Sequence, residues 1–222
     1  MLKKEVVMKL IIFGPPGVGK GTEAKLLAEK YSLEHISTGE MLRDAMRRGT
    51  ELGLLAKAKM DTGDLVPDDI MIGLIKDVIS SEKCKAGYIL DGFPRTIPQA
   101  EALDALFQKL GIKFDKVINM EIDENIIVNR LAARRGCKQC GGLFNLKNDN
   151  IVGNDCPKCG AKDSIFQRDD DKEETIKHRF KVYNEMTAPV KEYYRSKGML
   201  TDVNSEGSID EVFAKIVNAI EK

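Results

Sequence analysis

Residues 14–22 read GPPGVGKGT, a spacing of glycines and lysine that suits the binding of phosphate groups. The common phosphate-binding loop has glycine, four residues, glycine-lysine and then serine or threonine. Here Gly21 stands where the hydroxyl is expected, and Thr22 follows one residue late. Successive backbone N–H groups of such a loop bind anionic oxygens, and Lys20 adds a positive charge toward the β- and γ-phosphates. The loop predicts a nucleotide site whose Mg²⁺ environment differs from that of a GTPase.

A phosphate loop needs a strand before it and a helix after it, and the sequence supplies both. Residues 6–13 form a nearly continuous apolar run, typical of a buried parallel strand. Residues 20–31 place apolar side chains at helical spacing. The alternative is a tight turn that needs glycine only for its φ angles. The lysine and the flanking elements favour the phosphate loop.

Cysteines form the second group that could do chemistry. Four of the five fall in two close pairs with fifteen residues between them: Cys137, Cys140, Cys156 and Cys159. This spacing predicts a structural metal site, with zinc the first choice and iron an alternative. Four free thiols or a nucleic-acid-binding ribbon are less favoured, since residues 141–155 are neither strongly basic nor rich in aromatics. Cys84 stands alone, and we interpret it as an ordinary small side chain.

A third group lies at the end of a buried strand predicted in the sequence GYILDGF and ending in Asp91. Asp91 and Arg95 lie in the sequence DGFPRT, where the carboxyl edge of an α/β sheet binds ligands. Asp91 is placed to orient a magnesium shell, and the planar guanidinium of Arg95 matches a phosphate. More arginines lie near segment ends: Arg43, Arg130, Arg134, Arg168 and Arg179. Arg130 and Arg134 are four apart, so we expect them on one face of one helix. Together the arginines predict that several phosphates are bound.

Strands and helices alternate along the rest of the chain. Further strands are predicted at 116–122 and 198–203, and helices at 39–48, 52–60, from 68, at 97–110, at 123–135, at 171–197 and from 208. Asp171 and Glu174 suggest a capping box for the long helix, and Ser208 suggests a cap for the last one. The alternation predicts an α/β fold with a doubly wound parallel sheet, interrupted by an inserted cysteine segment.

The amino-acid composition disfavours some classes of binding partner. Lysine plus arginine equals aspartate plus glutamate, at 35 each, which disfavours a general nucleic-acid or membrane-surface binder. No run approaches the roughly 18 apolar residues of a membrane span. The first residues could begin a signal peptide, but no small-residue cleavage site follows. We therefore expect a cytoplasmic protein with no membrane or nucleic-acid partner.

Several motifs jointly resemble adenylate kinase, a nucleoside monophosphate kinase, of the long-lid, zinc-bearing bacterial type. They are GPPGVGKGT, STGEMLR, GDLVPDD, DGFPRT with Gln99, RLAARR and RDDDKEET…HRF. The resemblance runs from about Leu10 to the end of the chain, and Gly-Lys-Gly-Thr is the usual form of the loop in this family. It implies a P-loop NTPase-like three-layer sandwich with a five-stranded parallel sheet. One kinase domain would comprise a core (1–37, 67–133, 172–222), an AMP-binding helical insertion (38–66) and a zinc-ribbon lid (134–171).

The resemblance also implies roles for single residues. ATP would be bound by Gly17, Val18, Gly19, Lys20, Gly21, Thr22, Arg130, Arg134, Leu143, Phe144 and Gly207. AMP would be bound by Thr38, Arg43, Asp64, Leu65, Val66, Gly92, Phe93, Pro94, Arg95, Gln99, Arg168 and Arg179. The catalytic set would be Lys20, Asp91, Arg95, Arg130, Arg134, Arg168 and Arg179. Glu40 stands where the family often has aspartate, a change we expect to matter little.

The implied reaction is reversible, Mg²⁺-dependent phosphoryl transfer from ATP to AMP, which gives two ADP and maintains adenine nucleotide balance. Such transfer needs positioned oxygens and neutralised charge, and a lid that excludes water. We expect a monomer whose partners are ATP, AMP and ADP, with Mg²⁺ on ATP and structural Zn²⁺. The alternatives are a non-enzymatic nucleotide or zinc-dependent module, and a kinase for UMP or CMP. Thr96 and Gln99 favour AMP, because related pyrimidine kinases tend to have asparagine directly after the arginine.

Overall fold

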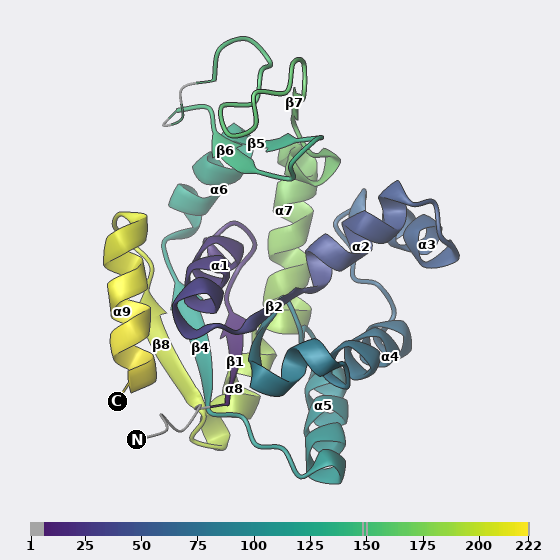
Figure 1. The fold of residues 1–222 in the computed structure, drawn as a ribbon, viewed down its shortest axis with the longest axis vertical. Helices are drawn as coiled ribbons and strands as arrows, with labels where there is room; N and C mark the ends of the chain where they lie inside the picture. The colour runs from purple at the N-terminus through teal and green to yellow at the C-terminus, as the bar shows by residue number, and fades with distance from the viewer. Residues whose placement is uncertain (1–6, 148, 150, 222) are drawn as a thin grey trace.

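A parallel β-sheet forms the centre of the molecule (Figure 1). The computed structural model describes residues 7–147, 149 and 151–221. Five strands pair in the order β2-β3-β1-β4-β8. Their bounds are β1 Met8–Phe13, β2 Glu34–Ser37, β3 Gly87–Asp91, β4 Lys116–Glu121 and β8 Leu200–Asn204. The predicted doubly wound sheet is confirmed, although Val6, the predicted first residue of β1, lies outside the described residues.

Strand β2 is present in the structure but was not predicted from the sequence pattern. Its four residues, EHIS, contain a single aliphatic side chain, Ile36. The strand forms through pairing with β3, in a register that sets Ser37 opposite Asp91. Because the pairing partner lies more than fifty residues away, local hydrophobic pattern could not reveal it.

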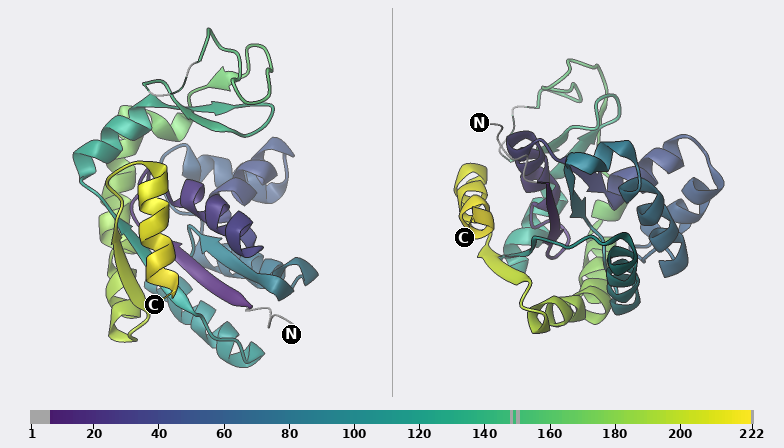
Figure 2. Two further views of the ribbon diagram at one scale, coloured as in Figure 1. Left: turned by 60° about the vertical axis from the view of Figure 1, so that its left-hand side comes forward. Right: turned by 60° about the horizontal axis from the view of Figure 1, so that its bottom comes forward.

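Helices cover both faces of the sheet (Figure 2). Alternate residues of β1 enter different cores: Ile11 and Phe13 pack toward one side, and Leu10 and Ile12 toward the other. The first core receives α4 (Asp68–Ile79), α5 (Ile97–Leu110) and α8 (Pro189–Ser196). The second receives α1 (Lys20–Tyr31), α6 (Glu124–Ala133), α7 (Glu173–Val182) and α9 (Ile209–Glu221). The implied three-layer arrangement is confirmed.

The long helix predicted to follow the cysteine segment differs from expectation in two ways. It begins at Glu173 with Lys172 as its N-cap, and no side chain caps it, so the predicted capping box of Asp171 and Glu174 is wrong. The carboxylate of Asp171 binds Arg134 instead. A π-helical turn, η3 (Tyr183–Thr187), then separates α7 from α8. The predicted cap of α9 is confirmed, because the Ser208 hydroxyl accepts from the Glu211 backbone N–H at 3.3 Å.

Two insertions stand at the carboxyl edge of the sheet (Figure 1). The first is the helical pair α2 (Thr38–Arg47) and α3 (Glu51–Met60), which follows β2. The second is the lid, with strands β5 (Arg134–Cys137), β6 (Leu143–Asn145) and β7 (Ile165–Phe166) in an antiparallel sheet ordered β6-β5-β7. Two short 3₁₀ turns, η1 (Glu82–Ala86) and η2 (Asp169–Asp171), complete the elements. Within the described ranges, no helix is both long and apolar enough to cross a membrane.

Candidate active site

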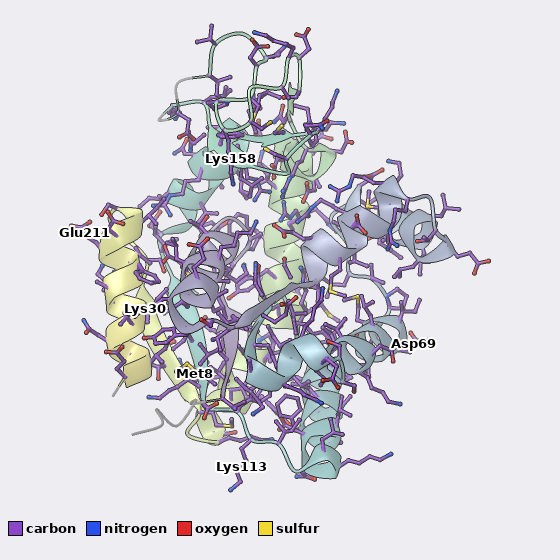
Figure 3. The ribbon with its side chains drawn as sticks, in the orientation of Figure 1. Met8, Lys30, Asp69, Lys113, Lys158 and Glu211 are labelled. Carbon is purple, nitrogen blue, oxygen red and sulfur yellow. The ribbon has the colours of Figure 1, made fainter. Side chains whose placement is uncertain are left out.

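Two adjoining pockets lie at the carboxyl edge of the sheet, between the glycine loop, the α2–α3 pair and the lid. Figure 3 shows the surrounding side chains, with Lys158 marking the lid and Asp69 the first turn of α4. The larger pocket, which we name the donor cleft after the role proposed for it below, has a volume of about 610 Å³. Its lining includes Gly17–Thr22, Arg43, Asp91, Gly92, Pro94, Arg95, Arg130, Arg134, Leu143, Phe144, Arg168, Arg179 and Gly207.

The smaller pocket, which we name the acceptor pocket after the role proposed for it below, gathers most of the residues predicted for AMP. Its lining includes Thr38, Arg43, Asp64, Leu65, Val66, Gly92, Arg95, Gln99 and Arg179. Arg43, Arg95 and Arg179 line both pockets, so they stand where the two meet. Phe93 lines neither pocket: its side chain is buried in the first hydrophobic core. Any ligand contact of Phe93 would therefore have to use its backbone.

The glycine loop is shaped by close packing as well as by backbone angle. Gly14 has φ +139°, and a Cβ there would lie 2.5 Å from the Met120 carbonyl oxygen. Gly17 has φ +84°, and a Cβ would lie 2.6 Å from Leu131. Both positions therefore exclude other residues, which brings the loop backbone onto β4 and α6. The loop leads directly into the N-terminus of α1, as phosphate binding requires.

Lys20 lies in a setting that disfavours its own charge. Its ammonium donates to the backbone oxygens of Gly14 at 2.7 Å and Pro15 at 2.8 Å. Burial lowers the pKa of Lys20 to about 7, and although Asp91 opposes this, nearby Arg95 and other guanidiniums add to it. A polyphosphate in the cleft would reverse this balance, because anions favour the charged ammonium.

Asp91 ends β3 beside the loop. Burial by itself would raise the pKa of Asp91, but a hydrogen bond with His35 and the charge of Lys20 outweigh it and hold the pKa below its usual value. His35 Nε2 lies 3.3 Å from Asp91 Oδ2. A Cβ on Gly21 would lie 3.3 Å from the same carboxylate, which is closer than ordinary van der Waals contact. The ionised carboxylate suits a magnesium shell.

Arg134 and Arg179 are held by two aspartates of η2. Arg134 donates to both carboxylate oxygens of Asp171, from Nε at 2.7 Å and from Nη2 at 2.5 Å. Arg179 Nη1 donates to the Asp170 backbone oxygen at 2.8 Å and lies 3.1 Å from its carboxylate. Asp171 is 1% exposed, so these ion pairs are well shielded from water. They fix the planes of both guanidiniums beside the cleft.

Arg130 and Arg134 do not share a helix face, contrary to prediction. α6 ends at Ala133, and Arg134 adopts an extended backbone as the first residue of β5. Pairing of β5 with β6, which sets Arg134 opposite Asn145, ends the helix there. Both arginines nevertheless line the donor cleft.

Like charge is crowded around the junction of the pockets. Burial, and then neighbouring Arg179, lower the pKa of Arg95 to about 10. Burial, and then Arg43 and Arg134, lower the pKa of Arg168 to about 10. Such a group of cations is stabilised by a polyanion and is positioned to hold several phosphates.

Gln99 is fixed in orientation beside Arg95. Its amide Nε2 donates to Asp68 Oδ1 at 2.7 Å, and its Oε1 accepts from the Arg95 backbone N–H at 2.7 Å. A primary amide has a second N–H and a second oxygen lone pair. Gln99 can therefore still present one donor and one acceptor to a ligand in the acceptor pocket.

Sequence reasoning missed the residues that orient the functional side chains. His35 binds Asp91, Asp68 binds Gln99, and Asp170 and Asp171 bind Arg179 and Arg134. Asp68 stands in the motif GDLVPDD, and Asp170 and Asp171 stand in RDDDKEET, but neither motif indicated which side chain each aspartate would bind.

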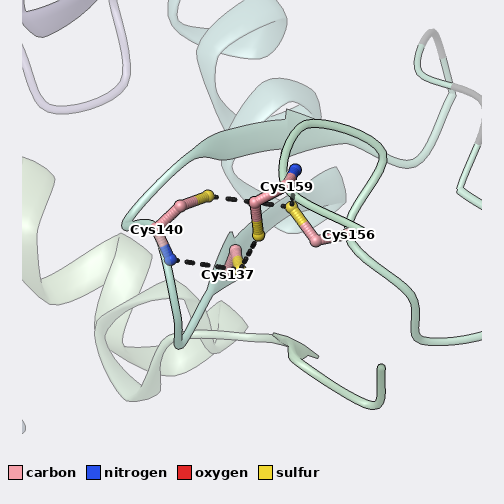
Figure 4. Close-up of side chains that lie close together, drawn as sticks. All are labelled: Cys137, Cys140, Cys156 and Cys159. Atoms are coloured by element: carbon pink, nitrogen blue, oxygen red, sulfur yellow. Dashed lines mark hydrogen bonds between the residues drawn. The ribbon is translucent and has the colours of Figure 1, made fainter. Parts of the chain in front are cut away.

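The four lid cysteines meet at one point (Figure 4). All four Sγ atoms lie within 4.8 Å of one another, with Cys137–Cys159 at 3.8 Å and Cys140–Cys156 at 3.7 Å. These distances are far longer than a disulfide bond of about 2.05 Å. Tetrahedral zinc with bonds of about 2.3 Å would hold sulfurs ~3.8 Å apart. The set therefore fits a structural zinc ion.

Backbone N–H groups support the cysteine cluster. The amides of Gln139 and Cys159 donate to the sulfurs of Cys137 and Cys156, at 3.3 and 3.4 Å. Such bonds favour thiolate, the form that binds metal. The hydrophobic cluster beneath is small: Cys137, Cys156 and Ile165 are its buried members.

Comparisons with known proteins match one family along nearly the whole chain. The family model described as "Adenylate kinase" matches residues 12–199. A protein named adenylate kinase from Archaeoglobus fulgidus is 48% identical over 220 residues, covering 97% of this chain and 99% of the relative. One of the same name from Chloroherpeton thalassium is 51% identical over 211 residues, covering 94% and 96%. Full-length matches of this kind, together with the glycine loop and the paired pockets, establish that the chain belongs to the adenylate kinase family.

Proposed function

We propose that this chain catalyses the reversible transfer of a phosphoryl group from MgATP to AMP, giving two ADP, and thereby maintains adenine nucleotide balance. The observation that carries the proposal is the junction of two pockets across Arg43, Arg95 and Arg179. A phosphoryl donor at the glycine loop and a monophosphate near Gln99 would meet at these guanidiniums. A single nucleotide-binding module needs no second pocket of this kind.

The donor phosphates would be held by the loop backbone from Gly17 to Thr22 and by Lys20. Mg²⁺, when bound with ATP, supplies further neutralisation of phosphate charge. Asp91 is suited to orient the water shell of that ion. Arg130, Leu143, Phe144 and Gly207, which line the same cleft, would contact the nucleoside of ATP.

The acceptor phosphate would be held by Arg43 and Arg95, with Thr38 and Gly92 beside them. Gln99 would read the adenine edge with its remaining donor and acceptor. The backbone from Asp64 to Val66 would form the opposite wall of the acceptor pocket. The backbone from Gly92 to Pro94 would lie close to the bound AMP. These assignments predict that AMP is preferred over pyrimidine monophosphates.

Transfer itself needs no covalent enzyme intermediate. The chain aligns the attacking and leaving oxygens and neutralises the equatorial charge with Lys20, Arg95, Arg134, Arg168 and Arg179. Because this cationic group is already assembled, little reorganisation is needed at the moment of transfer. The side chains of Asp170 and Asp171 set the orientation of two of the arginines.

We assign the parts of the domain accordingly. Residues 1–37, 67–133 and 172–222 form the core, 38–66 the AMP-binding insertion and 134–171 the lid. The lid would close over the nucleotides and exclude water, so that phosphate passes to AMP rather than to water. Zn²⁺ on the four cysteines would order the lid without entering the reaction. We further propose that the protein works as a cytoplasmic monomer that binds neither nucleic acid nor membranes.

A panel of nucleoside monophosphates with MgATP tests the function. We expect AMP to be phosphorylated fastest, with no turnover in excess EDTA. Faster phosphorylation of CMP or UMP than of AMP would contradict the assignment of the acceptor pocket.

A further inference from the structure

Glu23 carries a buried carboxyl group that the proposed reaction does not use. It lies in the first turn of α1, three residues after Lys20, and is 3% exposed. Its Oε2 is fully buried and has no hydrogen-bond partner among the residues that the structure describes. Buried acceptors without partners are unfavourable and uncommon in native proteins. A carboxyl group in this condition lacks a partner that a bound ligand could supply.

The carboxyl group belongs to the wall of the donor cleft. That wall continues into the loop before α9 and its first turn, where Ser205, Gly207, Ser208 and Val212 also line the cleft. Gly207 and its neighbours form the end of the cleft proposed to hold the donor nucleoside. Glu23 therefore faces the nucleoside region from α1 while α9 closes it from the other side.

The electrostatic environment of Glu23 differs from that of the groups proposed to bind phosphate. Burial, and then the neighbouring charge of Asp210, raise the pKa of Glu23 to about 7. Its surroundings are thus apolar and anionic, whereas those of Lys20 and Arg95 are cationic. A carboxylate here would repel phosphates. The part of a nucleotide that suits it is a neutral hydrogen-bond donor.

Nearby hydroxyl groups are engaged elsewhere. Ser208 Oγ donates to Glu211 Oε2 at 3.0 Å, and Ser205 Oγ donates to the Val203 backbone oxygen at 3.4 Å. Neither hydroxyl therefore donates a hydrogen bond to the Glu23 carboxyl group. Ile209 and Val212 add apolar surface to the same wall, which suits a flat purine ring.

We propose that Glu23 is a specificity-determining residue of the donor site, whose carboxyl oxygen accepts a hydrogen bond from the exocyclic amino group of the donor purine. The inference rests on the proposed function, because it places ATP in the donor cleft. Position 6 of the purine carries an amino donor in ATP and a carbonyl acceptor in ITP. A carboxylate facing this position attracts the first and repels the second.

The test is equilibrium binding of ATP and ITP to the full chain, measured by calorimetry at pH 8, above the pKa of about 7 of Glu23, so that the carboxyl group is mostly ionised. We expect the wild type to prefer ATP at least ~10-fold, the size expected for one hydrogen bond to a charged group. Glu23→Gln keeps the shape but presents an amide N–H that can donate to the ITP carbonyl. The ATP-to-ITP preference should fall by about 10-fold. Glu29→Gln, which removes the same charge from the exposed side of α1, should leave the preference unchanged.

A second variant keeps the test decisive if Glu23→Gln does not fold. Glu23→Asp keeps the charge but withdraws the carboxylate by one methylene, and it should also weaken the preference for ATP. A thermal scan of each variant accompanies the binding data.

An unchanged ATP-to-ITP preference in folded Glu23→Gln would overturn the proposal. So would equal loss of ATP and ITP binding with a lower melting temperature, which would mark a purely structural carboxyl group. Binding of 2′-deoxy-ATP distinguishes a contact to the base from a contact to the ribose. If Glu23→Gln changes the ratio of ATP affinity to 2′-deoxy-ATP affinity but not the ratio of ATP affinity to ITP affinity, the carboxyl group binds the ribose and the proposal is wrong. Phosphorylation of AMP by the wild type is measured separately. If the wild type did not phosphorylate AMP, the proposed function would be refuted. The comparison of ATP and ITP binding would still decide the role of Glu23.

Discussion

The donor cleft and the cysteine cluster of the lid are assembled in opposite ways. In the cleft, burial first and then the neighbouring cations lower the pKa values of Lys20 and Arg95. The surrounding core holds them in place despite this unfavourable setting. In the lid, the four sulfurs are matched to one metal ion, and little hydrophobic core lies beneath them. The cleft thus favours activity over stability, and the lid metal contributes stability rather than chemistry.

The largest effect should come from removing the loop cation. Lys20→Met should lower turnover on the order of 10²-fold or more, because one preorganised positive charge on the transferring group is lost. Its melting temperature should stay the same or rise, since the buried cation is unfavourable in the free protein. Initial rates and a thermal scan measure both. Near-normal turnover would remove the loop from the mechanism.

A smaller and more selective effect is expected at the junction of the pockets. Arg95→Ala should raise the KM for AMP by about tenfold, because a charge-assisted contact to its phosphate is lost. The KM for ATP should change much less. Initial rates over a grid of both substrates separate the two constants. An equal rise in both would show that Arg95 does not belong chiefly to the acceptor side.

The lowered pKa of Lys20 can be measured as proton uptake. The pKa of Lys20 is about 7 in the free protein, so at pH 8 it is largely neutral. Bound polyphosphate favours the ammonium and raises this pKa, so ATP binding at pH 8 should take up protons. Calorimetry in buffers of different ionisation enthalpy detects the uptake. Lys20→Met should lack this part of it, and identical values for both proteins would contradict the assignment.

The smallest effect on activity should come from the lid cluster. Cys156→Ser should lower the melting temperature by at least ~5 °C, because structural zinc contributes folding free energy. Turnover at moderate temperature should stay within about threefold of the wild type. Cys84→Ser, the same change at the buried cysteine outside the cluster, should keep one zinc per chain. A folded, zinc-loaded Cys156→Ser without activity would assign the cluster a direct part in chemistry.

Elements with strong local patterns were predictable from sequence. β1, α1 and α5 follow from apolar runs and periodicity, and the loop between β1 and α1 follows from its glycines and lysine. Features that depend on distant partners were not predictable. β2 exists because β3 pairs with it, and α6 stops short of Arg134 because β5 pairs with β6.

The same distinction applies to the site. Most of the residues proposed to touch ligands stand in motifs that the sequence displays. The pairings that orient them could not be predicted, because Asp171 reaches Arg134 across 37 positions and His35 reaches Asp91 across 56. The side chain of Asp171 fitted a helix cap by local pattern, but it is buried in an ion pair with the half-buried Arg134 instead. Glu23 escaped notice because its interest lies in having no partner among the described residues.

Conversion of ADP tests the central claim most directly. ADP and Mg²⁺ alone, followed by ³¹P NMR, should yield ATP and AMP in equal amounts until equilibrium. Lys20→Met should reach the same equilibrium at least ~100-fold more slowly. No conversion, or conversion of ADP to AMP and inorganic phosphate, would contradict the account, because the two pockets would then not pass phosphate between nucleotides.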